Sequence, residues 1–159
     1  MVDDGRPWVA GVCRRHFGGE TVVTRGRVHH PGRLPGLVAW EGDRRAGALC
    51  FCVEPGGAEV VLLVGEPPGR GAGSALLAAL DVLASERGWV RLWLVVTNDN
   101  TAALRFCQRR GWDLVALHAR GAEWDRGRKP EMPERGVDGV PIRHLLELQR
   151  VFPPAGEAG

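Results

Sequence analysis

The sequence contains no tyrosine, and its only lysine is Lys129. The net charge of +2 is too small to indicate binding to nucleic acid or to an anionic membrane. No apolar run approaches the roughly 18 residues of a membrane span, and the first residues, MVDDGRPW, lack the basic-then-apolar order of a secretory signal. These absences predict a cytoplasmic protein with no nucleic-acid partner and no membrane partner.

Cysteine is also scarce, with four residues at Cys13, Cys50, Cys52 and Cys107. In an intracellular protein they stay thiols. Cys50 and Cys52 fall on one face of a predicted strand, downstream of His29 and His30, which leaves a zinc site open as an alternative. The pairs lack the C-x₂-C or H-x₃-H spacing of zinc sites, however, so we expect buried apolar thiols and no metal.

The length and composition are those of one globular domain. The chain has 159 residues, of which 44% are apolar and 25% charged, enough for a hydrophobic core and too apolar for global disorder. We expect a single domain over residues 1–150. Residues 151–159 are rich in Pro and Gly and are expected to form a mobile tail.

The stretch from Ala58 to Gly88 carries the clearest functional pattern. Val60 to Val64 reads as a buried strand, and leucines at helical spacing follow a run of glycines up to Gly88, which is placed to end the helix. Free backbone N–H groups at the start of a helix, with no Cβ atoms in the way, favour a phosphate or pyrophosphate. A tight turn that binds nothing remains the alternative for this loop.

Two known phosphate loops do not fit the pattern. A P-loop needs Gly-Lys-Ser/Thr at the helix start, and the sole lysine lies elsewhere. A dinucleotide fingerprint needs a third glycine where Leu76 stands, and an acid in the next strand, Val90 to Val96, which has none. An NTPase is therefore unsupported, and a NAD-type oxidoreductase is a distant alternative.

The rest of the chain predicts a mixed sheet. Strand, helix and strand over residues 58–96 form a right-handed βαβ unit with parallel strands, whereas Leu37 to Glu41 and Ala46 to Val53 read as an antiparallel hairpin. Further strands are expected over residues 21–29, 113–118 and 142–148. Residues 120–138 are expected to be irregular and charged.

Two motifs together resemble the GNAT acetyltransferases. The loop Pro68-Gly69-Arg70-Gly71-Ala72-Gly73 is similar to the family's Q/R-x-x-G-x-G/A, with proline in place of Gln or Arg. One strand later, the helix starting at Asn100 is similar to N-x-x-A-x-x-F-Y-x-x-x-G-F/W; the matching residues are Asn100, Ala103, Phe106, Gly111 and Trp112, with Cys107 in the tyrosine place. The resemblance implies an acyl-CoA N-acyltransferase fold: a central mixed sheet of about six to seven strands, flanked by helices and splayed between its two central parallel strands.

The resemblance also implies acetyl-CoA as the co-substrate. Its pyrophosphate would lie on the amides of Gly69, Arg70, Gly71, Ala72, Gly73 and Ser74. Its pantetheine arm would pair with the main chain at Val61 and Leu63, near Asn100. Pro68 has no N–H, so one contact of the family is lost or made differently.

The chemistry implied is attack of an amine on the thioester, without a covalent enzyme intermediate. Glu59 is the candidate base because an acid within a buried strand needs a reason; pairing with an arginine, or exposure at the strand's start, is the alternative. Glu41 and Asp99 are further candidates for the base, should Glu59 not fill this role. In the family the tyrosine protonates the departing thiolate, and Cys107 stands in its place with a much shorter side chain, so we favour a packing role for it.

Arg126, Arg128 and Lys129 are candidates for binding an anionic acceptor, because binding groups collect on irregular loops; a solvated charged loop is the alternative. The acceptor itself is expected to be a small-molecule or peptide amine, and a homodimer is possible. The rival to an acetyltransferase is an acyl-CoA-binding sensor or partner protein that is catalytically idle because the tyrosine is missing.

Overall fold

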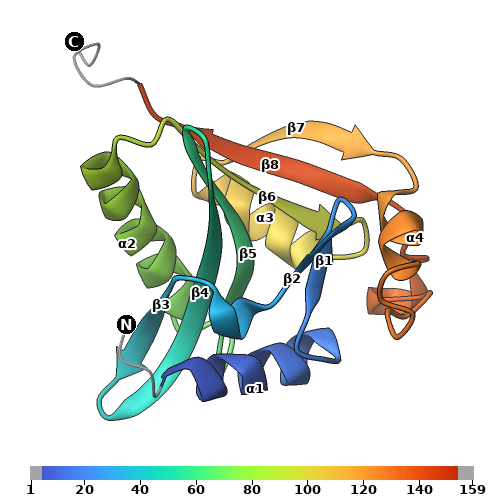
Figure 1. Ribbon diagram of the computed structural model, residues 1–159, viewed down its shortest axis with the longest axis horizontal. Coiled ribbons are helices and arrows are strands. Elements are labelled where there is room, and N and C mark those ends of the chain that lie inside the picture. Colours follow the sequence, from blue (N-terminus) through green and yellow to red (C-terminus); the bar gives the residue numbers. More distant parts are fainter. Residues whose placement is uncertain (1–4, 154–159) are drawn as a thin grey trace. The chain divides into compact units, whose positions relative to one another are not determined.

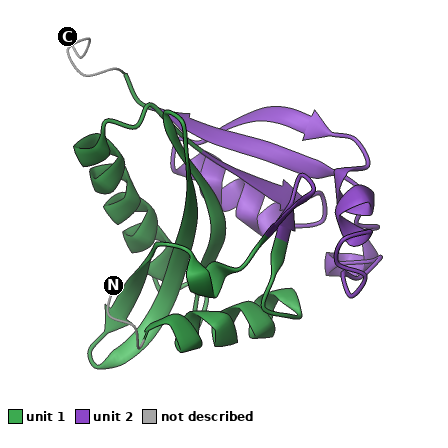
Figure 2. Ribbon diagram, in the orientation of Figure 1, with its two compact units in different colours: residues 1–22, 29–92, 152–159 green, residues 23–28, 93–151 purple. Residues whose placement is uncertain are grey.

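The computed structural model describes residues 5–153 (Figure 1). The chain divides into two compact units (Figure 2). Unit 1 is made of residues 1–22, 29–92 and 152–159, and unit 2 of residues 23–28 and 93–151. The predicted tail lies mostly outside the described residues, because only residues 151–153 of it are described. That residues 1–150 act as one domain stays a prediction.

Unit 1 is built from three antiparallel strands and two helices. Strand β3 pairs with β4, and β4 with β5. The predicted hairpin is confirmed, and its strands run on to Glu41 and Arg44, which face each other across the turn. The elements of this unit are α1 (Gly5–Phe17), η1 (Pro31–Arg33), β3 (Gly36–Glu41), β4 (Arg44–Glu54), β5 (Gly57–Gly65) and α2 (Ala72–Arg87).

The two helices of unit 1 cover opposite faces of its strands. Ala48 and Cys50 of β4 share a buried apolar cluster with Val12 of α1. Gly47, the residue before Ala48, instead faces α2, where a Cβ added to it would meet Leu76. Since successive residues of a strand point to opposite faces, α1 and α2 lie on opposite sides.

Strand β5 contains an irregularity at its centre. Cys50 pairs with Leu62 and the next residue, Phe51, pairs with Val60, so the register skips Val61. This is a β-bulge, which bends a strand and leaves the extra residue unpaired. It also places Glu59, opposite Cys52, on the α1 face of the strand, because Cys52 packs against the cluster that contains Val12.

Unit 2 contains most of β6 and everything after it up to Val151. Strand β7 pairs with β8 in antiparallel fashion. Asn100 caps α3 as predicted, since its side chain accepts a hydrogen bond from the N–H of Ala103 (3.2 Å). The elements are β6 (Arg91–Thr97), α3 (Thr101–Arg109), β7 (Asp113–His118), α4 (Gly121–Arg126), η2 (Val137–Gly139) and β8 (Leu145–Val151).

The prediction of one strand over residues 21–29 was wrong. The segment forms two short paired strands, β1 (Val22–Thr24) and β2 (Arg27–His29). Between them Arg25 and Gly26 have φ values of 50° and 79°, the left-handed conformation of a tight hairpin turn. The buried carboxylate of Asp125 accepts the N–H groups of both residues (3.2 and 2.7 Å), which stabilises the turn.

Two further sequence predictions need correction in unit 2. The segment 120–138 is not irregular throughout, because it contains α4 and the start of η2. The last strand begins at Leu145 rather than at Ile142. Ahead of Leu145, the backbone N–H groups of Arg143 and His144 are bound by the side chain of Asn98 instead of by a neighbouring strand.

The predicted fold class is confirmed. Six strands form one sheet in the order β3-β4-β5-β6-β8-β7, and α2 connects the neighbouring strands β5 and β6, so these two run parallel while the hairpin pairs are antiparallel. The splay between the parallel strands stays a prediction. Within residues 5–153, no helix is both long and apolar enough to cross a membrane.

Candidate functional site

The glycine loop between β5 and α2 has the backbone conformation that glycine favours. Gly69 and Gly71 have φ values of 82° and 87°, and Cβ atoms added to them would meet no atom within 4 Å. Gly71 is the N-cap of α2, and no side chain caps the helix there. The first turn of this 16-residue helix therefore presents backbone N–H groups and the positive end of its dipole beside an exposed loop.

Glu66 anchors the start of this loop to α1. Its carboxylate accepts hydrogen bonds from Arg15 Nε (3.0 Å) and Nη2 (2.6 Å), and lies 2.8 Å from His16 Nε2. The carbonyl oxygen of Glu66 accepts a hydrogen bond from Arg44 Nη1 (2.7 Å). The loop entrance is thus fixed through both the side chain and the main chain of one residue.

The charge on Glu66 is maintained down to low pH. The hydrogen bond from Arg15 lowers the pKa of Glu66 from 4.5 to about 2, with His16 adding to the effect and partial burial opposing it. Glu66 therefore remains a carboxylate, and the anchor remains ionic, throughout the physiological range.

Arg70, in the middle of the loop, is held by Glu41 at the end of β3. Arg70 Nη2 donates to Glu41 Oε1 (2.7 Å), and Arg44 Nη2 donates to the other oxygen (2.9 Å). Glu41 was a reserve candidate for the base, and the structure places it on the surface between two arginines. An exposed pair of this kind contributes little to stability but orients the side chain of Arg70.

Val61 and Leu63, the predicted main-chain partners of a pantetheine arm, lie in β5. Leu63 pairs with Leu49 of β4, whereas Val61 is the bulged residue without a partner there. Bulges concentrate next to active sites, where they redirect side chains and end the regular pairing. The bulge thus marks the centre of β5 as the irregular part of this strand.

Glu59 lies two residues before the bulge and is fully buried. Its Oε1 atom lies 3.4 Å from Nε2 of His29, which is itself 5% exposed. Within the described part of the chain, neither oxygen of Glu59 has a hydrogen-bond partner that meets normal geometry. Of the two alternatives that the sequence leaves, exposure and an arginine partner, neither is observed; the neighbour is a histidine.

In unit 2, Asn100 and Cys107 stand at the start and near the end of α3. The side-chain oxygen of Asn100 is engaged in capping the helix. Cys107 is 2% exposed, and burial raises the pKa of its thiol to about 11, with Arg110 opposing the shift. At neutral pH this group is a buried thiol, which agrees with a packing role.

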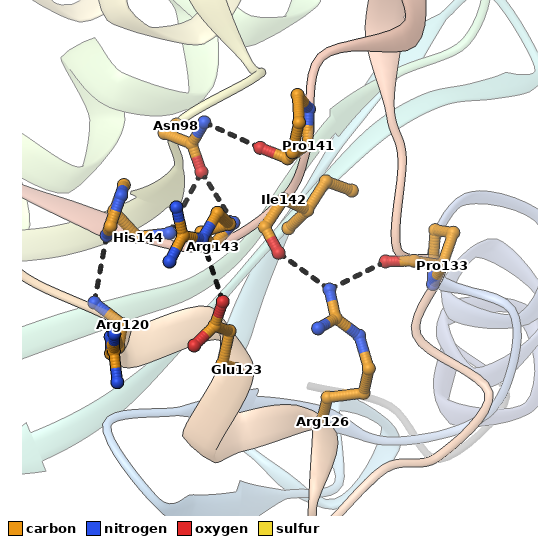
Figure 3. A network of polar contacts seen from close by, with 9 residues as sticks. All are labelled: Asn98, Arg120, Glu123, Arg126, Pro133, Pro141, Ile142, Arg143 and His144. Carbon is orange, nitrogen blue, oxygen red and sulfur yellow. Dashed lines mark hydrogen bonds and ion pairs between the residues drawn. The ribbon is translucent and has the colours of Figure 1, made fainter.

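Asn98, the first residue after β6, fastens the segment that precedes β8 (Figure 3). Its Nδ2 donates to the carbonyl of Pro141 (2.9 Å), and its Oδ1 accepts the N–H groups of Arg143 and His144 (2.9 Å each). Beside it Asp99, the other reserve base, is buried and accepts hydrogen bonds from Thr97 Oγ1 and the N–H of Val137.

The three basic residues expected to bind an acceptor lie in different environments. Arg126 donates to the carbonyls of Pro133 and Ile142 (Figure 3) and to that of Met132, and so it holds this segment together. Lys129 is 4% exposed, whereas Arg128 is exposed. Contact of any of the three with an acceptor stays a prediction, for which Arg128 has the most accessible side chain.

Sequence reasoning missed the residues that support the loop and the base candidate. Arg15 and His16 lie about 50 residues before Glu66 and carry no motif. His29 drew attention only as half of a His-His pair for zinc. Among the described residues, no group of three or more His, Cys, Asp and Glu is arranged to hold a metal ion.

Comparison with known proteins gives consistent matches. The model of the acetyltransferase (GNAT) family matches residues 13–112. The uncharacterized protein YxbD of Bacillus subtilis is 30% identical over 141 residues, covering 88% of this chain and 89% of the relative. The uncharacterized protein YdhI of the same organism is 28% identical over 139 residues, which cover 87% of this chain and 87% of the relative.

Solved structures match in fold at lower identity. A B. subtilis acetyltransferase in complex with CoA has a TM-score of 0.63 at 18% identity, over 73% of this chain and 75% of that one. The ribosomal-protein-S18-alanine N-acetyltransferase of Escherichia coli has a TM-score of 0.61 at 20% identity, over 80% and 74%. The expected acyl-CoA N-acyltransferase fold is thereby confirmed.

Proposed function

Because this chain belongs to the GNAT family of acetyltransferases, we propose that it transfers the acetyl group of acetyl-CoA directly to an amine. The observation that carries the proposal is the loop Gly69–Ser74, in which Gly71 starts α2 without a side-chain cap. The two structural relatives support it, since one is a CoA complex and the other is named an alanine N-acetyltransferase.

In this proposal the loop binds the pyrophosphate through backbone amides. Two negative phosphate groups at a helix N-terminus gain both hydrogen bonds and the favourable end of the dipole. The Glu66 anchor holds the loop in the required conformation before the cofactor arrives, so less ordering entropy is lost on binding. The unpaired bulge at Val61 supports the prediction that the main chain of β5 receives the pantetheine arm.

The acceptor amine must lose a proton before it can attack the thioester. An alkylamine with a pKa near 10.4 is protonated at pH 7, and holding it neutral costs about 4.6 kcal/mol (roughly 3.4 units at 1.36 kcal/mol each). We assign the base to Glu59, a fully buried carboxyl group, because the interaction of a carboxylate with a cation is strong away from solvent. Desolvation of the amine lowers the cost further.

Departure of the thiolate needs no acid from the protein in this scheme. After the amine nitrogen has bonded to the thioester carbon, that nitrogen still carries a proton, which passes to the sulfur as the C–S bond breaks. Cys107, with a pKa of about 11, is a weak proton donor toward a CoA thiolate. Both the burial of Cys107 and the weak acidity of its thiol therefore favour a packing role.

The test is a CoA-release assay run beside calorimetry with CoA. The acceptors are a primary alkylamine, an aminosugar antibiotic and a peptide with an N-terminal alanine. Turnover with any of them supports the proposal. Tight CoA binding without turnover favours the acyl-CoA sensor, and absence of CoA binding contradicts both.

A further inference from the structure

Glu59 differs from the buried acids Asp125 and Asp99 in how its oxygens are satisfied. Asp125 is fully buried and accepts two backbone N–H groups, and the buried Asp99 accepts one hydroxyl and one N–H. Glu59 is equally buried, yet in the described residues its oxygens meet no hydrogen-bond donor at normal geometry, and its polar neighbour is His29 Nε2 at 3.4 Å.

A buried carboxyl group without donors reduces stability, because the desolvation of the group is not offset. A carboxyl kept for structure alone would be expected to resemble those of Asp125 and Asp99. The lone pairs of Glu59 are therefore left without a donor in the described part of the chain, and the ammonium group of a bound acceptor is a donor of the kind that they lack.

The position of His29 supplies what Glu59 lacks. Full burial separates Glu59 from bulk water, so a proton that it accepts needs a second group to leave by. His29 ends β2 and precedes His30, which is exposed. An imidazole ring has two nitrogens, so a proton received at one of them can be passed on from the other.

We propose that Glu59 and His29 act as one proton-accepting pair, with His29 as the positioning residue through which Glu59 is discharged. The inference rests on the proposed acetyl transfer and extends it. One N–H bond of the acceptor ammonium breaks, its proton goes to Glu59 and then to Nε2 of His29, and the freed amine attacks the thioester. A further N–H proton of the amine ends on the CoA sulfur, so the products are the amide, neutral CoA thiol and one proton on the imidazole.

Other titratable groups near Glu59 do not offer this route. On the elements of unit 1 that pack against this face of β5, Cys52 stands opposite Glu59 on β4 and Cys13 lies in the apolar cluster of α1. Of the charged residues of α1, Arg14 pairs with Glu20, Arg15 and His16 pair with Glu66, and Arg6 is exposed.

The experiment compares His29→Gln, Glu59→Gln and the double variant with wild type, using His30→Gln as the matched control. His30 is adjacent and exposed, and its side chain caps nothing. Each protein is assayed for turnover of the amine panel, for the pH dependence of kcat/KM, for CoA affinity by calorimetry and for Tm.

We expect Glu59→Gln to lower kcat by about 10²–10⁴-fold, the usual contribution of a base, and His29→Gln by about tenfold or more with unchanged CoA affinity. The double variant should be no slower than Glu59→Gln alone, because residues acting as a unit are not additive. His29→Gln should also shift the acidic limb of the kcat/KM profile, whereas His30→Gln should change nothing.

Three results would overturn the inference. They are turnover by His29→Gln equal to that of the wild type, losses of rate that multiply in the double variant, and a pH profile of kcat/KM that His29→Gln leaves unchanged. Should His29→Gln fail to fold, Glu59→Gln and the wild-type profile decide, because a wild-type rate without an acidic limb excludes the pair. If the wild type turns over none of the acceptors, the proposed function itself is contradicted. The failure of the proposed function can thus be told apart from the failure of the inference about Glu59 and His29.

Discussion

Replacement of Gly71 by alanine separates a loop that binds a diphosphate from one that merely turns the chain. Gly71 has φ +87° and starts α2, and a Cβ added to it would meet no protein atom within 4 Å. Any steric effect of the new methyl group must therefore fall on a ligand. The remaining effect is conformational, because an alanine in the left-handed region costs about 1–2 kcal/mol.

The magnitudes can be stated in advance. For a protein of this size, each kcal/mol corresponds to about 2–4 °C in Tm, so Gly71→Ala should lower Tm by about 2–8 °C. A methyl group that holds the phosphates away from the helix amides should weaken CoA binding at least about tenfold, which equals about 1.4 kcal/mol. Calorimetric titration with CoA and a thermal melt measure the two effects independently.

Gly18→Ala is the matched control. Gly18 has φ +74°, and a Cβ there also meets nothing within 4 Å, but it follows α1 and lies outside the loop. The control should lose a similar amount of Tm and retain the CoA affinity of the wild type. If Gly71→Ala lost Tm to the same extent and still bound CoA normally, the N-terminus of α2 would not be the pyrophosphate site.

Four further outcomes test the structure. Glu66→Gln should weaken CoA binding about threefold to tenfold by calorimetry. Because the pKa of Glu66 is lowered to about 2, its contribution to stability is present above pH 4.5 and disappears as the pH falls from 4.5 toward 2. The Tm values of the variant and the wild type should therefore converge at the acidic end of this range. Cys107→Ala should keep kcat within about tenfold, and a fall of about 10²–10⁴ would make the thiol a general acid. Asn98→Ala should lower the free energy of unfolding by about 1–3 kcal/mol in a urea titration, since it leaves the partly buried N–H of His144 without its side-chain acceptor; no change would mean that water replaces the amide. Glu59→Leu should abolish turnover and raise Tm by about 2–4 °C, because it removes a buried carboxyl without donors; a lower Tm would assign Glu59 a structural role.

The elements that could be predicted from the sequence are those whose information is local. The glycines before α2, the Asn100 cap of α3 and Gly88 at the end of α2 are each specified by a few neighbouring residues, and all three are found as expected. The helix periodicity and the hairpin belong to the same class, because their patterns lie within about 20 residues.

The elements that were mispredicted depend on partners far away in the chain. The two-strand turn at Arg25 is stabilised by Asp125, 100 residues later. The start of β8 is delayed because Asn98 binds the backbone of Arg143, 45 residues on. The apolar pattern of both segments is that of a continuous strand, and nothing within the segments shows that a distant side chain takes their backbone hydrogen bonds.

The same distinction explains why the co-substrate is easier to infer than the acceptor. A site made of backbone amides requires glycine at a few positions and leaves the other residues unconstrained, so a few letters of one sequence are enough to indicate it. An acceptor is recognised by side chains, and in this chain the segment that carries Arg126 and Arg128 is held by contacts such as Arg126 to the carbonyl of Ile142, in which the partner is main chain. Such contacts fix the shape of the segment without specifying its exposed residues. An exposed side chain such as Arg128 therefore does not identify the amine by itself, whereas the glycines of the loop are sufficient to indicate the co-substrate.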